Sequence, residues 1–197
     1  MISAQLKELL LQALVHERGG VLVYQTALEC AINKDLVGEW TKYLAQTEKH
    51  VTVLTDVCET LGVDPGEMTP GCQIVQHNGK ALVIAMKMAL AEAEPAAAQL
   101  VACDCVLLAE TKDHANWELI GECAKAMDPP ITAVLTGAYE EIEEEEDEHL
   151  YHTQGWCREL WLQALGLPAE LPPLEEKRDV KSASEAEDAK KSRRPKR

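Results

Sequence analysis

The sequence predicts an all-helical protein, and three features support this. Alanine and leucine, which favour helix, are abundant in the 197 residues, whereas phenylalanine is absent and aromatic residues make up only 4%. Long runs of Val, Ile, Thr and Tyr, which favour strands, are missing. Apolar residues recur at helical spacing along four long segments. We therefore expect one domain of four main helices that is long enough to bury a substantial core.

The first helix is expected from about residue 3 to residue 33. Its apolar stripe includes Leu14, Val21 and Tyr24. Glu17 falls on the same stripe, four residues before Val21 and seven before Tyr24. A carboxylate that faces a core is costly unless it is paired or bound to a metal. The alternative is a wide stripe with Glu17 at its edge.

The second helix is expected from about residue 35 to residue 61, ending before Gly62. His50 lies among its inward apolar positions, where a histidine is more often a satisfied core residue than a ligand. Residues 62–79 are rich in Gly and Pro and indicate an irregular connection. A separate short amphipathic helix is expected from Lys80 to Glu94. Together these segments predict a long crossover between the second and third main helices.

The third main helix is expected to begin near Pro95 and to reach about residue 127. Glu110 lies on its inward stripe, and His114 is one turn further along the same side. Asp113 is also close, at three residues. A carboxylate and an imidazole that share a helix face can bind the same metal ion.

The fourth main helix is expected from about residue 131 to residue 165, after a break at two consecutive prolines. Glu146 and His149 are three residues apart and therefore lie on one face, one turn apart. They belong to an acidic run that starts at Glu140. The alternative interpretation of such a run is a solvated helix face.

Residues 167–197 are expected to form a disordered tail outside the helical domain of residues 1–166. The tail begins with a proline-rich stretch, lacks apolar periodicity and ends in the basic sequence KKSRRPKR. It is either a solubilising tail or a docking tail for an acidic partner or for the protein's own surface.

The formal net charge of -15 argues against nucleic acid as a partner and favours the attraction of cations. The seven cysteines are scattered, without a Cys-x-x-Cys pair, so neither a zinc knuckle nor a redox pair is indicated. We expect most of them to be reduced, buried residues of a cytoplasmic protein. The N-terminal apolar run is interrupted by charge, which predicts an amphipathic helix rather than a signal peptide, and no segment is expected to cross a membrane.

The four main helices each offer at least one inward ligand, and carboxylates and histidines that meet inside a bundle are typical of di-metal carboxylate proteins. From about Leu6 to Leu165 the chain resembles the ferritin-like superfamily, in the style of bacterioferritin and rubrerythrin. The motifs that carry the resemblance are Glu17 followed seven residues later by Tyr24, Thr47-Glu48-Lys49-His50, Leu107-Leu108-Ala109-Glu110, and Glu146-Asp147-Glu148-His149.

The resemblance implies a four-helix bundle with a long crossover, a metal centre and Fe(II) oxidation by oxygen or peroxide. Iron is the expected metal, with manganese or zinc as alternatives. Tyr24 is the expected catalytic residue, which hydrogen-bonds a ligand or passes an electron. The family also implies homo-oligomers, a dimer or a larger assembly.

The chain departs from the family at Thr47, where the family has a glutamate that bridges two metals. A threonine hydroxyl is neutral and a poor ligand, and Glu48 points about 100° away round the helix. His114 is a candidate for the missing ligand. Haem-binding members have a methionine where this chain has Glu48, so no haem is expected.

The departure predicts two unequal metal sites. One is expected to use Glu110, Glu146 and His149, and the other Glu17, His50 and a shared carboxylate. Two alternatives stay open: a metal-binding bundle without catalysis, and a structural bundle that has lost its metal and holds its Glu and His residues by hydrogen bonds.

Overall fold

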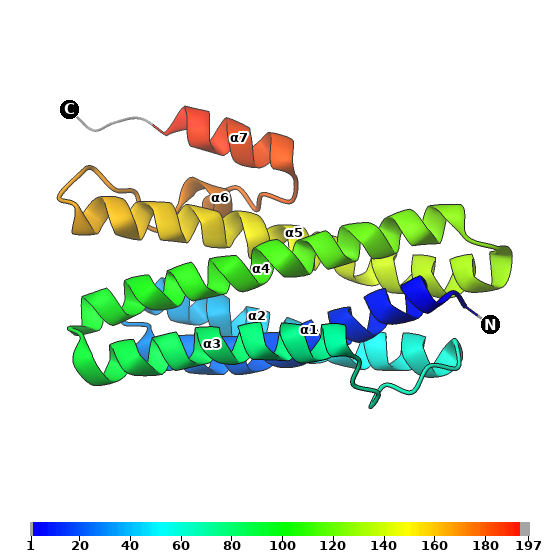
Figure 1. Cartoon of the computed structure of the whole chain (residues 1–197). Helices are drawn as coiled ribbons and strands as arrows, with labels where there is room; N and C mark the ends of the chain where they lie inside the picture. The colour runs from blue at the N-terminus through cyan, green and yellow to red at the C-terminus, as the bar shows by residue number, and fades with distance from the viewer. Residues whose placement is uncertain (1, 194–197) are drawn as a thin grey trace.

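The computed structural model describes residues 2–193, and this range is helical without a strand (Figure 1). The prediction of an all-helical protein is therefore confirmed. The helices are α1 (Ala4–Cys30), α2 (Lys34–Thr60), α3 (Pro70–Glu92), α4 (Pro95–Ala126), α5 (Pro129–Ala164), α6 (Leu174–Lys177) and α7 (Ala183–Ser192).

The long helices begin where the sequence supplies a cap or a proline. The Ser3 hydroxyl accepts a hydrogen bond from the backbone N–H of Leu6, and the Asn33 side chain caps the first turn of α2. Helices α3, α4 and α5 each begin with proline, whose fixed φ suits the first helical turn. The predicted ends of the four main helices consequently lie within about three residues of the observed ones.

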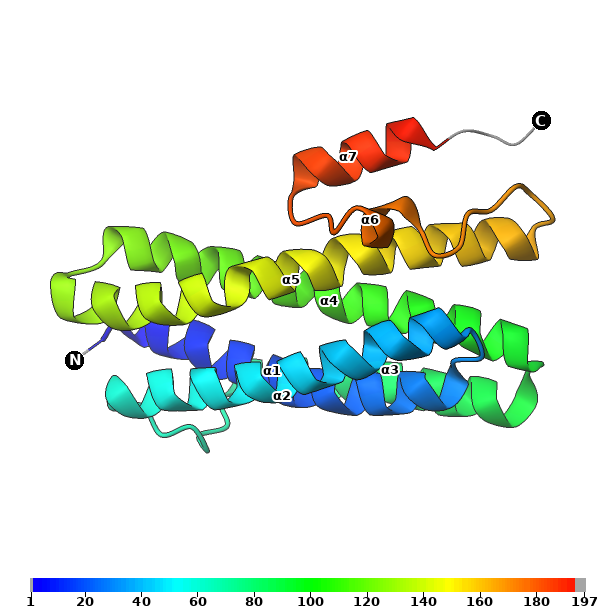
Figure 2. The same cartoon turned by 180° about the vertical axis from the view of Figure 1, so that it is seen from behind.

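Helices α1, α2, α4 and α5 lie side by side (Figures 1 and 2). Helix α1 packs on α2 and α4, and α5 packs on α4 and α2, so the four surround a shared interior. One apolar cluster includes Leu14, Leu54, Trp117 and Ile142. A second includes Val23, Tyr43, Val106 and Trp156. Along each of the four helices, the two clusters are separated by a stretch that contains buried polar residues.

Helix α3 is longer than the sequence predicted. It begins at Pro70 behind a Thr69 cap and has 23 residues, so the irregular connection between α2 and α3 covers only residues 61–69. The prediction of a loop up to Gly79 was wrong because that glycine marks a close helix contact: a Cβ there would lie 3.8 Å from the Gly19 Cα of α1. Helix α3 packs on α1 and α4, outside the shared interior.

The C-terminal segment, residues 167–193, contains α6 and α7 where the sequence indicated a disordered tail. The Arg158 guanidinium of α5 donates two hydrogen bonds to the buried Glu175 carboxylate, at 2.8 and 2.9 Å. Arg193 donates to Glu159 at 2.6 Å, so the last described basic residue lies on the protein's own surface. Ion pairs of this kind do not produce a periodic pattern of apolar residues in the sequence. The remainder of the basic tip, residues 194–197, lies outside the described residues.

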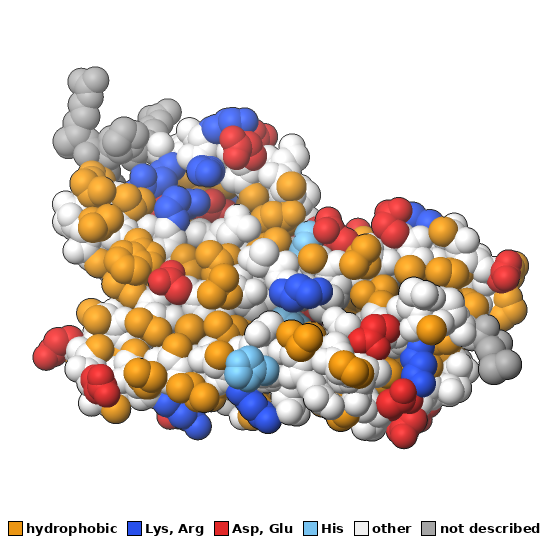
Figure 3. All heavy atoms as spheres, viewed as in Figure 1, with side chains coloured by type: hydrophobic (Ala, Val, Ile, Leu, Met, Phe, Trp, Pro, Cys, Tyr) orange, Lys and Arg blue, Asp and Glu red, His pale blue; other side chains and the backbone are white. Residues whose placement is uncertain are grey.

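The seven cysteines are free, and all but Cys123 are buried, as the sequence predicted. Over residues 2–193, no helix combines the length and the apolar character needed to span a membrane. On the face shown in Figure 3, hydrophobic side chains gather over α3 and α4, and Ile84, Met88 and Leu108 are among the exposed large apolar residues of these helices.

Candidate metal centre

Five buried ionisable side chains meet between the two apolar clusters, and we call them the central cluster. Helix α1 contributes Glu17, α2 contributes His50, α4 contributes Glu110, and α5 contributes Glu146 and His149. None of the five is more than 4% exposed. The structure thus brings together every ligand that the sequence predicted except His114.

The central cluster divides into two overlapping groups, each with its potential ligand atoms within 4.8 Å of one another. The first is Glu17, His50 and Glu146, and the second is Glu110, Glu146 and His149. In the first group, His50 Nδ1 lies 3.0 Å from Glu146 Oε1 and 3.4 Å from Glu17 Oε1. In the second, His149 Nδ1 lies 3.5 Å from Glu110 Oε2 and 3.8 Å from Glu146 Oε1. Glu146 is the carboxylate common to both.

Many of these atoms have no hydrogen-bond partner. Glu17 Oε2, His50 Nδ1, Glu110 Oε2 and both oxygens of Glu146 are buried and make no hydrogen bond, and their nearest charged neighbours are the other members of the cluster. Within residues 2–193, the ion pairs of these three carboxylates are with histidines and none is with Lys or Arg. A buried carboxylate without a cation is destabilised by several kcal/mol. The ligand set therefore suits a metal ion that accepts nitrogen and oxygen.

The electrostatics of the cluster reflect this excess of negative charge. Burial, with the charge of Glu17, raises the pKa of Glu146 to about 7 although His50 opposes the shift. Burial also disfavours the charged form of His50, but the charge of Glu17 and the contacts with Glu145 and Glu146 outweigh it and raise the pKa of His50 well above its ordinary value. Protons on these two groups therefore offset part of the negative charge of the cluster.

Asp113 is a buried acid that belongs to the surroundings of the cluster. It is 4% exposed, and its Oδ1 has no hydrogen-bond partner. Burial, followed by the charges of Glu17 and Glu146, raises the pKa of Asp113 well above its usual range. Its position three residues after Glu110 was the only sequence signal for this location.

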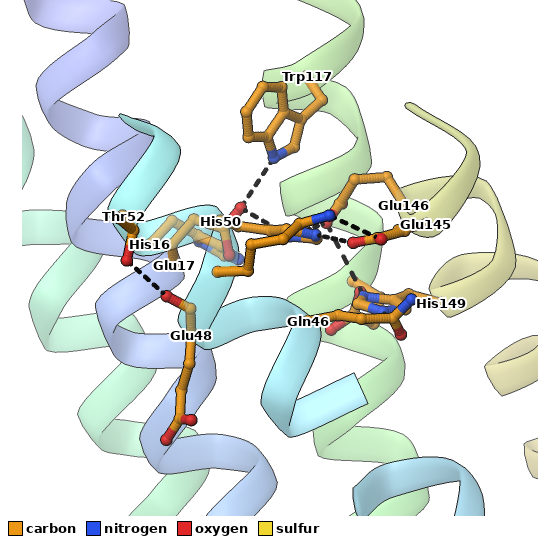
Figure 4. Close-up of polar contacts among 12 residues, drawn as sticks. His16, Glu17, Gln46, Glu48, His50, Thr52, Trp117, Glu145, Glu146 and His149 are labelled. Carbon is orange, nitrogen blue, oxygen red and sulfur yellow. Dashed lines mark hydrogen bonds and ion pairs between the residues drawn. The ribbon is translucent and has the colours of Figure 1, made fainter. Parts of the chain in front are cut away.

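Two hydrogen bonds between α2 and α5 orient the histidines (Figure 4). His50 Nε2 donates to Glu145 Oε2 at 2.8 Å, and His149 Nε2 donates to Gln46 Oε1 at 3.1 Å. Both rings are thus held with Nδ1 toward the central cluster, which is the role that outer hydrogen bonds have at metal sites. Glu145 and Gln46 were not predicted from the sequence as partners of the histidines, although each lies four residues before a histidine.

Aromatic side chains close the cluster on both sides. Trp117 Nε1 donates to Glu17 Oε1 at 2.8 Å. On the other side, the Tyr43 ring centroid lies 4.3 Å from that of His149, and the Tyr24 centroid lies 6.1 Å from it. The Tyr24 hydroxyl is buried without a hydrogen-bond partner, and burial together with the charge of Glu110 raises its pKa well above the usual range. Tyr24 is therefore a neutral phenol beside the cluster.

Thr47 and Glu48 lie as the sequence predicted. Thr47 is buried at 3% exposure, and a Cβ on Gly20 would approach its methyl group to 3.2 Å. Glu48 is exposed and lies away from the histidines (Figure 4). Helix α2 therefore offers the central cluster one ligand, His50, and no carboxylate.

His114 does not join the central cluster. Its Nε2 lies 2.8 Å from Asp147 Oδ1, and its side chain is 15% exposed. The four-residue step from Glu110 rotates His114 by about 40° round α4, toward the acidic run of α5. The suggestion that it replaces the missing ligand was therefore wrong.

His114 instead lines a pocket of about 200 Å³ between α4, α5 and the start of α7. Four carboxylates also line the pocket: Glu118, Glu143, Asp147 and, from the central cluster, Glu146. A negatively charged opening concentrates cations. Glu146 is thus the member of the central cluster that borders this pocket.

No family model, curated protein or solved structure matches this chain.

Proposed function

We propose that this chain is a ferritin-like metal-binding protein in which α1, α2, α4 and α5 form the four-helix bundle and α3 belongs to the crossover. It binds two divalent first-row metal ions in the central cluster. Iron is the metal that the resemblance implies, and manganese and zinc suit the same ligands. The activity that we propose is the oxidation of Fe(II) by oxygen or peroxide.

The observation that supports this proposal is the set of unpartnered atoms on Glu17, His50, Glu110 and Glu146. A structural core with these groups is expected to satisfy them with hydrogen bonds, because unsatisfied buried polar atoms are strongly unfavourable. Here they instead converge in two groups around one carboxylate. Two cations, one held by each group with Glu146 in common, would satisfy both groups.

Bound iron supplies the redox chemistry, and the chain's own residues hold and shield it. Glu17, His50 and Glu146 hold one ion, and Glu110, His149 and Glu146 hold the other. Glu145 and Gln46 keep the imidazole rings in place. Tyr24 has a free hydroxyl with which to donate a hydrogen bond to a ligand at the Glu110 side.

Anaerobic Fe(II) titration followed by oxygen tests the proposal. The wild-type protein is expected to bind two Fe(II) per chain in the central cluster, counted as the difference from Glu146→Gln, and to show a stoichiometric absorbance change when oxygen is added. Glu146→Gln removes the shared ligand and abolishes both results. Glu140→Gln makes the same change at an exposed position of the same acidic run and serves as the matched control. A flat trace from protein with two bound iron ions contradicts the oxidation step.

A non-catalytic metal-binding protein is the second candidate, and Thr47 favours it because the cluster lacks a second bridging carboxylate. Elemental analysis of protein purified without chelator separates the two. Compared with Glu146→Gln, a surplus of about one metal per chain in wild type supports this candidate, whereas a surplus of two supports the first. If Glu146→Gln changes neither metal content nor stability, the structural bundle without metal replaces both.

Assembly and localisation also belong to the proposal. The exposed apolar side chains over α3 and α4 favour a homo-oligomer. The charge of -15 and the free cysteines suit a cytoplasmic protein without a nucleic-acid partner.

A further inference from the structure

A second group of potential ligands lies one turn beyond His149 on α5. His152 is 2% exposed, and its Nδ1 lies 3.0 Å from the Tyr43 hydroxyl. Its Nε2 is buried and makes no hydrogen bond. A buried ring nitrogen without a hydrogen-bond partner indicates a site for a ligand, because such atoms are rarely left unsatisfied.

Two carboxylates accompany this histidine. Glu148, also on α5, is 7% exposed, and Asp179 belongs to the C-terminal segment between α6 and α7. Each of Glu148, His152 and Asp179 offers one potential ligand atom, and these three atoms lie within 4.8 Å of one another. We call these three residues the outer triad. It shares no residue with the central cluster.

The surroundings of the outer triad are rich in negative charge. Glu39 Oε2 lies 3.9 Å from His152 Nδ1. Burial and the nearby charge of Glu39 raise the pKa of Glu176 to about 7. Carboxylates that are crowded in this way favour a divalent cation between them.

Two lysines also contact the triad, but both lie at its rim. Lys42 Nζ is 2.6 Å from Glu148 Oε1, and Lys181 Nζ is 3.6 Å from Asp179 Oδ2. Their side chains are 46% and 37% exposed, so each ammonium group can turn into solvent when a cation binds. Neither contact satisfies His152 Nε2.

We propose that Glu148, His152 and Asp179 form a further metal site, which binds one divalent ion such as Zn²⁺ or Mn²⁺ and ties the C-terminal segment to α5. One imidazole nitrogen and two carboxylate oxygens suit these borderline cations and leave coordination positions for water. The contact between Tyr43 and His152 Nδ1 orients the ring with Nε2 free. Because Ser182 and Ala183 line the pocket that reaches Glu146, the bound ion also holds part of the wall of that pocket.

Asp179→Asn tests the site with little disturbance of the backbone. Asp179 has φ 52°, a left-handed conformation that asparagine adopts as readily as aspartate. The substitution therefore removes the charge of one ligand without adding strain. Asp188→Asn, at an exposed position of α7, is the matched control in the same segment.

Two measurements on the full chain give the readout. In equilibrium dialysis against Zn²⁺ with metal analysis, Asp179→Asn is expected to bind one ion per chain fewer than wild type and Asp188→Asn. At free Zn²⁺ ten times the dissociation constant, local opening of residues 174–182, followed by hydrogen exchange, is expected to slow about tenfold in wild type. The same protection is expected in Asp188→Asn and absent in Asp179→Asn.

Equal zinc content in wild type and Asp179→Asn overturns this site, as does zinc protection that Asp179→Asn leaves unchanged. Loss of an ion from Asp188→Asn as well shows a nonspecific charge effect and also overturns it. Ions in the central cluster cancel in the difference between variants, so the result is independent of the function proposed above.

Discussion

The two histidine-bearing helices of the central cluster place equivalent residues in equivalent positions. On α2, Gln46 and Thr47 lie four and three residues before His50. On α5, Glu145 and Glu146 lie four and three residues before His149. Each histidine points its Nδ1 inward. Its Nε2–H group donates a hydrogen bond to the other helix, to the residue that lies four positions before the histidine of that helix. The difference is that α5 has two carboxylates where α2 has an amide and a hydroxyl.

This difference makes the two halves of the cluster chemically unequal. His50 donates to a carboxylate, which raises the basicity of its inward nitrogen, whereas His149 donates to a neutral amide. The contacts of His50 Nδ1 with its two carboxylates, at 3.0 and 3.4 Å, are also shorter than those of His149, at 3.5 and 3.8 Å. We therefore expect the first metal ion to bind beside His50 and the second to bind more weakly.

Removal of the shared carboxylate is expected to have the largest effect. Glu146→Gln takes one ligand from both halves, so the stabilisation by metal is expected to disappear. At a metal concentration 100 times the dissociation constant, that stabilisation is about 2.7 kcal/mol for each site, or about 5–10 °C in Tm per site. Calorimetry with and without Mn²⁺ measures it, with Glu140→Gln as the control. A shift in Glu146→Gln as large as in wild type contradicts the shared role.

Thr47→Glu makes the two helices more alike and sharpens the comparison. It adds another buried carboxylate beside Gly20, where space is limited. Without metal, the free energy of unfolding is expected to fall by about 1–3 kcal/mol, because the new charge has no partner. With metal, the affinity of the weaker site is expected to rise about tenfold. Denaturant unfolding measures the stability without metal, and calorimetric titration measures the metal affinity. An unchanged free energy of unfolding without metal would count against the prediction.

Glu145→Gln tests the difference in affinity between the two halves of the central cluster with a smaller expected effect. It gives both histidines a neutral amide partner, so the affinity of the tighter site is expected to fall about tenfold and to approach that of the weaker site. A calorimetric titration with two distinct phases in wild type should then become closer to a single phase. If the weaker phase changes instead, the assignment of the tighter site to His50 is wrong.

The smallest effect on stability is expected at low pH, and it is expected in the C-terminal segment rather than in either half of the central cluster. Although burial opposes it, hydrogen bonds from Arg193, the Glu170 N–H and Arg158 hold the pKa of Glu159 below its usual value. Stability from this group is complete above the unfolded pKa of about 4.3 and is lost as the pH falls through the depressed folded value. Hydrogen exchange of residues 174–193 is expected to accelerate below pH 4 before that of α1 or α4. Simultaneous loss of protection contradicts this order.

Helical spacing predicted the central cluster because a helix fixes which residues share a face. Glu17, His50, Glu110, Glu146 and His149 were all found in this way. Partners from different helices were harder to predict, since no period within one helix links Gln46 to His149. His114 and Glu110 share a side of α4, yet Asp147 of α5 determines where the imidazole lies.

The extent of α3 and the fold of the C-terminal segment were not predictable from periodicity. Gly79 indicates a loop in isolation, but in the structure it allows close packing against Gly19. The C-terminal segment is held by ion pairs such as Arg158 with Glu175, whose partners are 17 residues apart in the chain. Such contacts become visible only once the helices are placed.

Anomalous scattering from crystals grown with Mn²⁺ or Fe(II) tests the central claim most directly. We predict two peaks that share Glu146, one beside Glu17 and His50 and one beside Glu110 and His149, with higher occupancy at the His50 position. Metal bound only elsewhere, or a central cluster without a peak at saturating metal, contradicts the account.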